Sequence, residues 1–473
     1  MPLLNYHSSQ NKKLLLTEAI VAFLIVYIPF EPFLLKFTND SIYPFLNYAT
    51  EIIILILFFT VLTAHFLNRE KFIKTPIDIP LAVFIAITFI SSLVNRAPLF
   101  LWIIGLRQIF RYTLLYYIIV YSRFSKEMAK RLVILLLTLL LLQSTIALAQ
   151  AFIGKRADEF LLPGAKREFA GIVSPAYVYQ FWSSGQRVFS TMGRYDRLGT
   201  FICFMLILAA GIFYEVKKIT DKKKLLALMI LPFAALIFTY SRMSWLGFIL
   251  GLIFINVAVK KNKKFIIVSS VLFLICTVYL FIYVKSNNIK VSSISDNASM
   301  TIPSRILSLF SFEELKISYN GYGRLYFFVN TPKKVVSKYP FFGVGFGQYG
   351  SGVAYAFQNK KVYDELGLPF GIENRQGQID NNWMSLWGEG GTLGLIAFIG
   401  IILSLFLFSW RLYQTVDDDF IKGIALGFLG IVIAVSFQAC LGPYFEVRTL
   451  SFYFWLMAGV VVCLGKKDLK FTA

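Results

Sequence analysis

The sequence predicts an all-α polytopic membrane protein of about twelve transmembrane helices, with a large extracytoplasmic helical loop between helices 9 and 10. Of its 473 residues, 57% are hydrophobic and only 15% are charged, whereas about a quarter of a soluble domain is charged. Runs of about 20 apolar residues, enough to cross a bilayer as a helix, recur along the chain. Lysine and arginine gather between alternate runs, as they do in the cytoplasmic loops of membrane proteins.

The apolar runs set the expected helices in order along the chain. Their approximate bounds are 17–35, 45–66, 78–95, 99–121, 132–152, 198–216, 224–240, 243–259, 265–285, 382–409, 420–438 and 447–465. No small-residue cleavage site follows the first run, so we expect a retained helix and not a signal peptide.

Basic clusters predict the orientation of the helices. They occur near the N-terminus, at 69–74, 123–131, 217–224 and 260–264, and at the C-terminus. All of them fall on one side of the membrane if both termini are cytoplasmic, as the positive-inside rule requires. The net charge of +21 is therefore explained by topology, and we expect no nucleic acid as a partner.

Two long connections remain, and both are then expected outside the cytoplasm. The predicted organisation has three parts: 1–285 with helices 1–9 and an outer loop at about 153–197, 286–380 as a cap loop, and 381–473 with helices 10–12. A structureless loop as long as 286–380 would be unusual, so we expect short helices in it. The aromatic segment Phe169–Trp182 in the other loop either anchors at the interface or stacks on sugar rings or prenyl chains.

Ionisable residues in the outer halves of the spans are candidates for function, because charges inside a membrane are costly. Arg107 and Arg111 lie one turn apart on one helix face, and Arg107 is about 12 Å from the outer end of its span. Glu31, Glu51 and Glu389 lie at a similar depth. These residues either line a polar cavity that opens outward or pair with one another to hold helices together.

Four arginines at the outer surface run against the positive-inside bias: Arg194, Arg197, Arg242 and Arg324. A guanidinium stays charged and binds phosphate oxygens in a bidentate manner, so phosphate is a suitable ligand. Anchoring at lipid headgroups is the alternative.

Three motifs in this order resemble the O-antigen ligase and polymerase superfamily, whose membrane glycosyltransferases resemble the GT-C class. They are "YSRMSWLGFILGL", "RLYFFVNTP" with "YPFFGVGFGQYG", and "DNNWMSLWGEGGTLGL". The resemblance implies a bacterial plasma (inner) membrane protein with its active site facing the periplasm or exterior. It also implies a polyprenyl-pyrophosphate-linked oligosaccharide as substrate, with a flippase and a chain-length regulator as possible partners.

By motif position, Arg242 and Arg324 match the family arginines that are thought to meet the pyrophosphate. Ligases typically show "HN" where this chain has Asp380-Asn381, and the only histidines, His7 and His65, are predicted at the cytoplasmic side. Aspartate at this place is similar to the polymerase branch, which joins repeat units.

The expected chemistry needs cations at the departing pyrophosphate and a carboxylate near the acceptor hydroxyl. We expect Arg242 and Arg324 to serve as the cations, and Asp380 to orient the hydroxyl and take its proton. Capping the following helix is the alternative role for Asp380. Glu389 would face the opposite side of a straight helix, so it ranks second as base and could instead be the partner of a buried arginine.

The remaining candidate residues are expected to contact substrate: Arg107, Arg194, Arg197, Asn381, Asn382, Glu51 and Tyr240. No metal or cofactor is expected. The acidic run Asp417–Asp419 falls on the cytoplasmic side and is interpreted as a solvated turn. The four dispersed cysteines do not predict a metal site.

The sequence thus favours a polysaccharide polymerase that acts on O-antigen, capsule or exopolysaccharide repeat units. A ligase of the same superfamily, acting on a lipid A core or another acceptor, stays open. So does a flippase or transporter of lipid-linked sugar, although a transporter would place its charges near the bilayer midplane.

Overall fold

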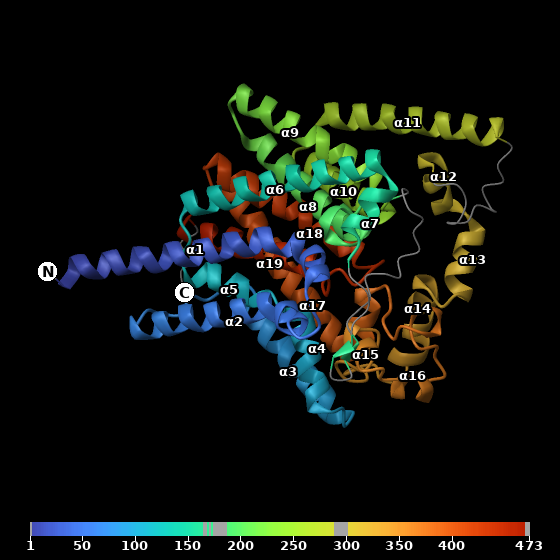
Figure 1. Ribbon diagram of the computed structural model, residues 1–473, viewed down its shortest axis with the longest axis horizontal. Helices are drawn as coiled ribbons and strands as arrows, with labels where there is room; N and C mark the ends of the chain where they lie inside the picture. The colour runs from blue at the N-terminus through green and yellow to red at the C-terminus, as the bar shows by residue number, and fades with distance from the viewer. Residues whose placement is uncertain (1, 164–167, 170–171, 174–186, 288–300, 469–473) are drawn as a thin grey trace.

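The computed structural model describes residues 2–163, 168–169, 172–173, 187–287 and 301–468. Long helices form one bundle, and the short helices α12 to α16 gather at one end of it (Figure 1). The two chain termini lie toward the opposite end of the bundle. The predicted fold class, an all-α polytopic membrane protein, is confirmed.

The first part of the chain forms helices that run through the bundle. They are α1 (Pro2–Leu34), η1 (Leu35–Phe37), α2 (Tyr43–Leu67), α3 (Asp78–Val94), α4 (Leu99–Phe110), α5 (Thr113–Tyr121) and α6 (Lys126–Ile153). The connection that follows holds α7 (Lys155–Leu161), the antiparallel strands β1 (Glu168–Phe169) and β2 (Ile172–Val173), and η2 (Ser190–Met192). The predicted aromatic segment lies outside the described residues, apart from Phe169 and β2.

The remaining long helices come before and after the short helices in the sequence. Before them come α8 (Tyr195–Glu215), α9 (Ile219–Phe238), α10 (Arg242–Ile253) with the π-helical η3 (Phe254–Val259), and α11 (Lys263–Ser286). After them come α17 (Asn382–Thr415), α18 (Asp419–Gln438) and α19 (Arg448–Asp468).

We call the described residues 301–381 the cap. The cap contains α12 (Ile302–Leu307), η5 (Ser308–Phe310), α13 (Phe312–Asn320), α14 (Arg324–Asn330), the π-helical η6 (Thr331–Val336), α15 (Gly352–Ala356), α16 (Lys361–Glu365) and η7 (Ile372–Asn374). Its own apolar core includes Phe327, Tyr349 and Tyr363. The cap is therefore a folded layer over one end of the bundle.

All twelve apolar runs fall on helices, although fewer helices satisfy strict span criteria. Among the described residues, nine helices are long and apolar enough to cross a membrane, or ten if a bent pair is one span. Helix α3 has 17 residues, and α9 carries Asp221 and three lysines, Lys222–Lys224, near its start. Because α3 and α9 do not meet the span criteria, ten spans, with the bent pair counted as one, are found in the described part of the chain where the sequence predicts twelve.

The predicted span at 99–121 is not one straight helix. It is divided into α4 and α5, which meet at an angle of 59°. No proline or glycine lies at the break, which falls at Arg111 and Tyr112. Both side chains are buried. Helix α4 packs against α3 and α15, whereas α5 packs against α2 and α19, so tertiary packing accounts for the change of direction.

Helices α8 and α18 form the centre of the bundle, where glycines let two backbones approach closely. A Cβ atom built on Gly211 would lie 2.3 Å from the backbone nitrogen of Gly427. Polar residues cap several helices: Ser125 accepts from the N–H of Met128, and Asn262 accepts from that of Phe265. Such caps satisfy N–H groups that the helix itself leaves unpaired.

A break in α17 connects the cap to the bundle. Gly391 has φ +63° and ψ −170° inside this helix, a conformation that strongly favours glycine. The loop Pro340–Gly345 hydrogen-bonds into the opening: the N–H of Val344 donates to Gly388, that of Gly345 donates to Glu389, and that of Thr392 donates to Pro340. Gly391 therefore both bends the helix and lets the backbone of this loop approach closely.

Candidate functional site

Three consecutive residues at the start of α17 have three different roles. Asn381 is the N-cap, and its Oδ1 accepts from the N–H of Met384 at 3.1 Å. Asn382 is 1% exposed and bonds to Glu446 and Phe445. Asp380 instead faces Arg324. The alternative role predicted for Asp380, capping the helix, thus belongs to its neighbour Asn381.

An accessible ion pair of the cap joins Arg324 to Asp380. Arg324 Nη2 lies 3.4 Å from Asp380 Oδ2, and the two side chains are 39% and 32% exposed. Arg194, which forms a bidentate pair with Asp196 at 3.0 and 3.1 Å, also interacts electrostatically with Asp380. Burial raises the pKa of the nearby Tyr444 far above its ordinary value, so its phenol stays neutral.

Arg197 belongs to the same end of α8. Its charge acts on Asp196, which places it in the group around Arg194. The structure therefore brings together four of the predicted site residues: Arg324, Asp380, Arg194 and Arg197. All of them lie where α8, α17 and the cap meet.

Arg242 is the first residue of α10, directly after the turn from α9, and is bound by the cap. Its Nη2 is 3.3 Å from Glu314 Oε1, and its Nη1 donates to Ser308 Oγ at 2.8 Å. Tyr240 contributes its carbonyl to the same region, where it accepts from Arg305 Nε at 3.3 Å. The cap residues thus hold the turn that carries the predicted phosphate-binding arginine.

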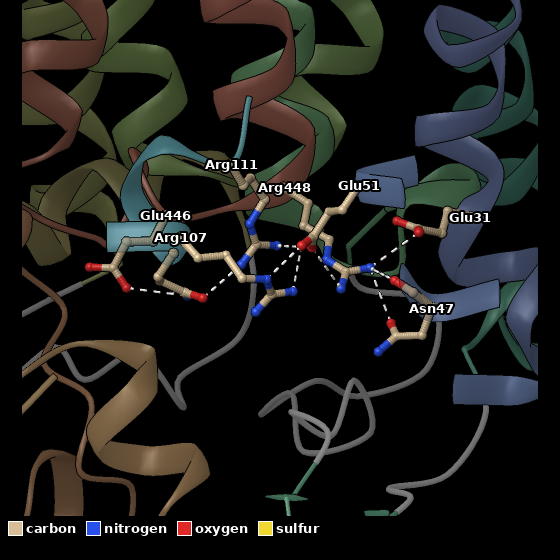
Figure 2. Close-up of polar contacts among 8 residues, drawn as sticks. Glu31, Asn47, Glu51, Arg107, Arg111, Glu446 and Arg448 are labelled. Atoms are coloured by element: carbon tan, nitrogen blue, oxygen red, sulfur yellow. Dashed lines mark hydrogen bonds and ion pairs between the residues drawn. The ribbon is translucent and has the colours of Figure 1, made fainter. Parts of the chain in front are cut away.

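Figure 2 shows Arg107, Arg111 and Arg448 converging on Glu51. The Arg107 Nη2 and Glu51 Oε2 atoms are 2.5 Å apart, and Arg111 Nη1 and Arg448 Nη2 lie 3.6 and 3.5 Å from Glu51 Oε1. Arg448 also pairs with Glu31 at 3.1 Å. Four of the five charges predicted in the outer halves of the spans therefore pair with one another or with Arg448, and Glu389 is the exception. We call Arg107, Arg111, Arg448, Glu51 and Glu31 the arginine cluster.

Glu446 connects the arginine cluster to the start of α17. Its Oε1 accepts from Asn382 Nδ2 at 3.0 Å, and its Oε2 accepts from Gln108 Nε2 at 3.4 Å. The N–H of Gly352, at the start of α15, donates to Oε2 at 3.1 Å. Burial raises the pKa of Glu446, against the lowering effect of these donors and of Arg111.

Glu389 has partners other than the buried arginine that the sequence suggested. Its carboxylate accepts from the N–H of Tyr349 at 3.1 Å and from Ser351 Oγ at 2.7 Å. Tyr349 and Ser351 belong to the loop that follows Pro340–Gly345. This loop lies across the broken segment of α17, so the Glu389 side chain reaches it. Glu389 thus joins the cap to the helix that contains it.

Histidines and aspartates elsewhere do not join this site. His65 is buried beside Glu70, 3.4 Å from it, near the α2–α3 connection, and His7 is in the first turns of α1. Asp418 caps α18 and pairs with Lys126. Asp419 pairs with Lys217 at 2.9 Å. Within the described part of the chain, no group of three or more His, Cys, Asp and Glu residues could hold a metal ion.

Sequence reasoning missed several residues of the site: Arg448, Glu446, Gln108, Glu314, Ser308, Arg305 and Asp196. Arg448 had a detectable signal, because it is an arginine at the outer end of the last helix, next to a short outer connection, and opposes the positive-inside bias, as Arg242 does. Glu446 lies two residues before it but had no such signal, because the positive-inside bias concerns lysine and arginine. The cap residues that bind Arg242 had none, because their pairing depends on how the cap folds over the bundle.

Part of the chain matches a known family. Residues 227–399 match the family model described as O-antigen ligase. This range includes Arg242, Arg324, Asp380 and the broken part of α17. No curated protein matches the chain. Members of the matched family are glycosyltransferase-like enzymes that are embedded in the lipid bilayer and act on lipid-linked saccharides. The match over residues 227–399 of the 473-residue chain supports membership of the O-antigen ligase/polymerase superfamily.

Proposed function

We propose that this protein is a polysaccharide polymerase. It transfers an oligosaccharide from a polyprenyl-pyrophosphate donor to a lipid-linked acceptor at the outer leaflet of a bacterial inner membrane. The observation that carries the proposal is the pair of Arg324 and Asp380, a cation and a carboxylate 3.4 Å apart and both partly exposed. They lie where the cap meets the bundle, inside the segment that matches the family.

The arginines supply the charge that the leaving group needs. Glycosyl transfer breaks the bond between the anomeric carbon and the pyrophosphate, and negative charge grows on the pyrophosphate oxygens. Preorganised cations stabilise that charge most effectively where water is restricted. Arg324 binds the pyrophosphate in this proposal, and Arg194 and Arg242 assist it. Arg242 would exchange its contact with Glu314 for phosphate oxygens.

Asp380 acts on the acceptor. Its carboxylate accepts a hydrogen bond from the attacking sugar hydroxyl, orients the oxygen toward the anomeric carbon and takes the proton as the new glycosidic bond forms. The pyrophosphate leaves with the electron pair of the broken bond. Because Asn381 already caps α17, Asp380 is not required for the helix and can serve the substrate.

The orientation in the membrane follows from the positions of the basic residues. Both termini, which carry lysines, lie toward the end of the bundle away from the cap (Figure 1). The positive-inside rule supports cytoplasmic termini, and in this proposed orientation the cap and Asp380 face the periplasm or exterior. There the lipid-linked units delivered by a flippase are within reach.

A ligase that uses a different acceptor is the second candidate, and the description of the matched family favours it. The polymerase interpretation depends on aspartate at position 380, where ligases typically have histidine.

The experiment that separates the two candidates uses purified protein in liposomes, supplied with lipid-linked repeat units as the only sugar substrate. A ladder of longer lipid-linked chains supports the polymerase. Product that forms only when a lipid A core or another acceptor is added establishes the ligase and refutes the polymerase.

A further inference from the structure

Glu446 is a buried carboxylate on which three separate parts of the molecule converge. It lies in the connection between α18 and α19 and is 4% exposed. Gln108 reaches it from α4, Gly352 from the cap and Asn382 from the start of α17. All three partners donate hydrogen bonds, and none of them is a cation.

The orientation of both side-chain amides is dictated by their other partners. Arg111 carries only donors, and its Nη2 lies 2.6 Å from Gln108 Oε1, so the NH₂ group of Gln108 must face Glu446. The N–H of Phe445 donates to Asn382 Oδ1 at 2.9 Å, so the NH₂ group of Asn382 must face Glu446 as well. Both carboxylate oxygens of Glu446 are therefore required as acceptors.

We propose that Glu446 is a positioning residue for the transfer reaction. It holds Asn382, and with it the Asp380-Asn381 segment, at a fixed place relative to α4 and the arginine cluster. The chain of contacts runs from Arg111 through Gln108 and Glu446 to Asn382, two residues from Asp380 (part of it is visible in Figure 2). This inference rests on the proposed function, because the group that Glu446 positions is the proposed base.

The donor-only surroundings make glutamine a poor replacement for Glu446. In Glu446→Gln, one of the two oxygens becomes an NH₂ group, which then faces either Asn382 or the pair Gln108 and Gly352, all donors. A second substitution repairs this conflict. In Glu446→Gln/Asn382→Asp, one new carboxylate oxygen still accepts from the Phe445 N–H, and the other accepts from the glutamine NH₂ group. In Asn382→Asp alone, two carboxylates face each other.

The test compares wild type, Glu446→Gln, Asn382→Asp and the double variant in liposomes with lipid-linked repeat units, and follows initial rates at several donor concentrations. The melting temperature of each purified variant is measured alongside. We expect kcat to fall by about 10- to 100-fold in each single variant, the cost of a small misplacement of a reacting group, while the donor KM stays near the wild-type value. The double variant should recover most of the lost kcat.

Three results would overturn the inference. One is wild-type kcat in Glu446→Gln, which refutes the positioning role and leaves the polymerase intact. Another is a double variant that regains the wild-type melting temperature but not kcat, which reduces Glu446 to a structural contact. The third is a loss that appears only in KM. If wild type reacts only with an added acceptor, the polymerase fails, and the same four proteins are compared in that ligase reaction.

Discussion

Arg324 and Asp380 face each other within the cap, just before α17 begins, with 3.4 Å between Nη2 and Oδ2. The pair is available for substrate because the neighbouring Asn381 caps the helix and Asn382 is committed to Glu446 and Phe445. Three consecutive residues thus have separate roles: Asp380 is the proposed base, Asn381 caps α17, and Asn382 makes the contact with Glu446 that positions the segment.

Removal of the Arg324 charge should remove stabilisation of the departing pyrophosphate. We expect Arg324→Ala to lower the transfer rate by about 10²- to 10³-fold, the usual cost of losing one preorganised donor. Arg324→Lys should retain part of the rate, because it keeps the charge but loses the planar fork. The rates are measured with lipid-linked repeat units in liposomes. Arg123→Ala is the control, since Arg123 is exposed and pairs with Glu70; equal rates in Arg324→Ala and this control would contradict the assignment.

The contact between Arg242 and Glu314 predicts a competition between cap and substrate. In Glu314→Gln the cap loses the negative charge that faces Arg242, so pyrophosphate meets less resistance and the donor KM should fall. Arg242→Ala should greatly reduce the formation of long polymer while the protein remains in the membrane. Both effects are followed by initial-rate kinetics. An unchanged KM in Glu314→Gln together with normal polymer in Arg242→Ala would exclude Arg242 from the site.

Asn381 should contribute to stability through its N-cap hydrogen bond at the start of α17. Asn381→Ala removes the acceptor for the Met384 N–H and should lower the free energy of unfolding by about 1 kcal/mol, the typical value for a lost N-cap. Asn381→Ser keeps an acceptor and should stay close to wild type. Thermal unfolding in detergent measures the stability of both variants. Equal melting temperatures for Asn381→Ala and Asn381→Ser would show that the N-cap hydrogen bond is energetically unimportant.

The break in α17 should not tolerate a side chain at Gly391. A Cβ atom there would lie 2.4 Å from the Gly343 nitrogen, at a φ of +63°. A backbone with positive φ and ψ −170° alone costs a non-glycine residue on the order of 1–3 kcal/mol, and the contact with backbone adds to it. We expect Gly391→Ala to lower the melting temperature and the yield of folded protein. Gly394→Ala is the matched control, because its Cβ would meet only Ile87, at 4.0 Å; similar behaviour of the two variants would argue against the docking of the cap loop at this break.

Much of the fold was predictable from the sequence. Apolar runs set the positions of the helices, and their spacing left 286–380 as a segment that needed structure of its own. Pairing among the charges in the outer halves of the spans, seen between Arg107 and Glu51, was one of the two alternatives that the sequence left open, since these charges lie at similar depth. Each of these predictions depends on a local pattern or on the high cost of an unpaired charge in a bilayer.

The rest depends on contacts between distant segments. The break at Arg111 and Tyr112 has no proline or glycine to mark it, because packing of α4 and α5 against different neighbours produces it. Glu389 binds Tyr349 and Ser351 because a cap loop lies across the broken helix. These contacts depend on how the folded cap packs against the bundle. No periodic pattern in the sequence predicts that packing.

The rate of a single transfer by Asp380→Asn, compared with Asn381→Ser in the same liposome assay, tests the central claim most directly. The asparagine keeps the shape of the side chain but cannot take a proton, so we predict a rate lower by about 10²- to 10⁴-fold, the range for a lost general base. The serine variant should transfer sugar at nearly the wild-type rate. A wild-type rate in Asp380→Asn would contradict the account, because the carboxylate beside Arg324 would then have no part in the reaction.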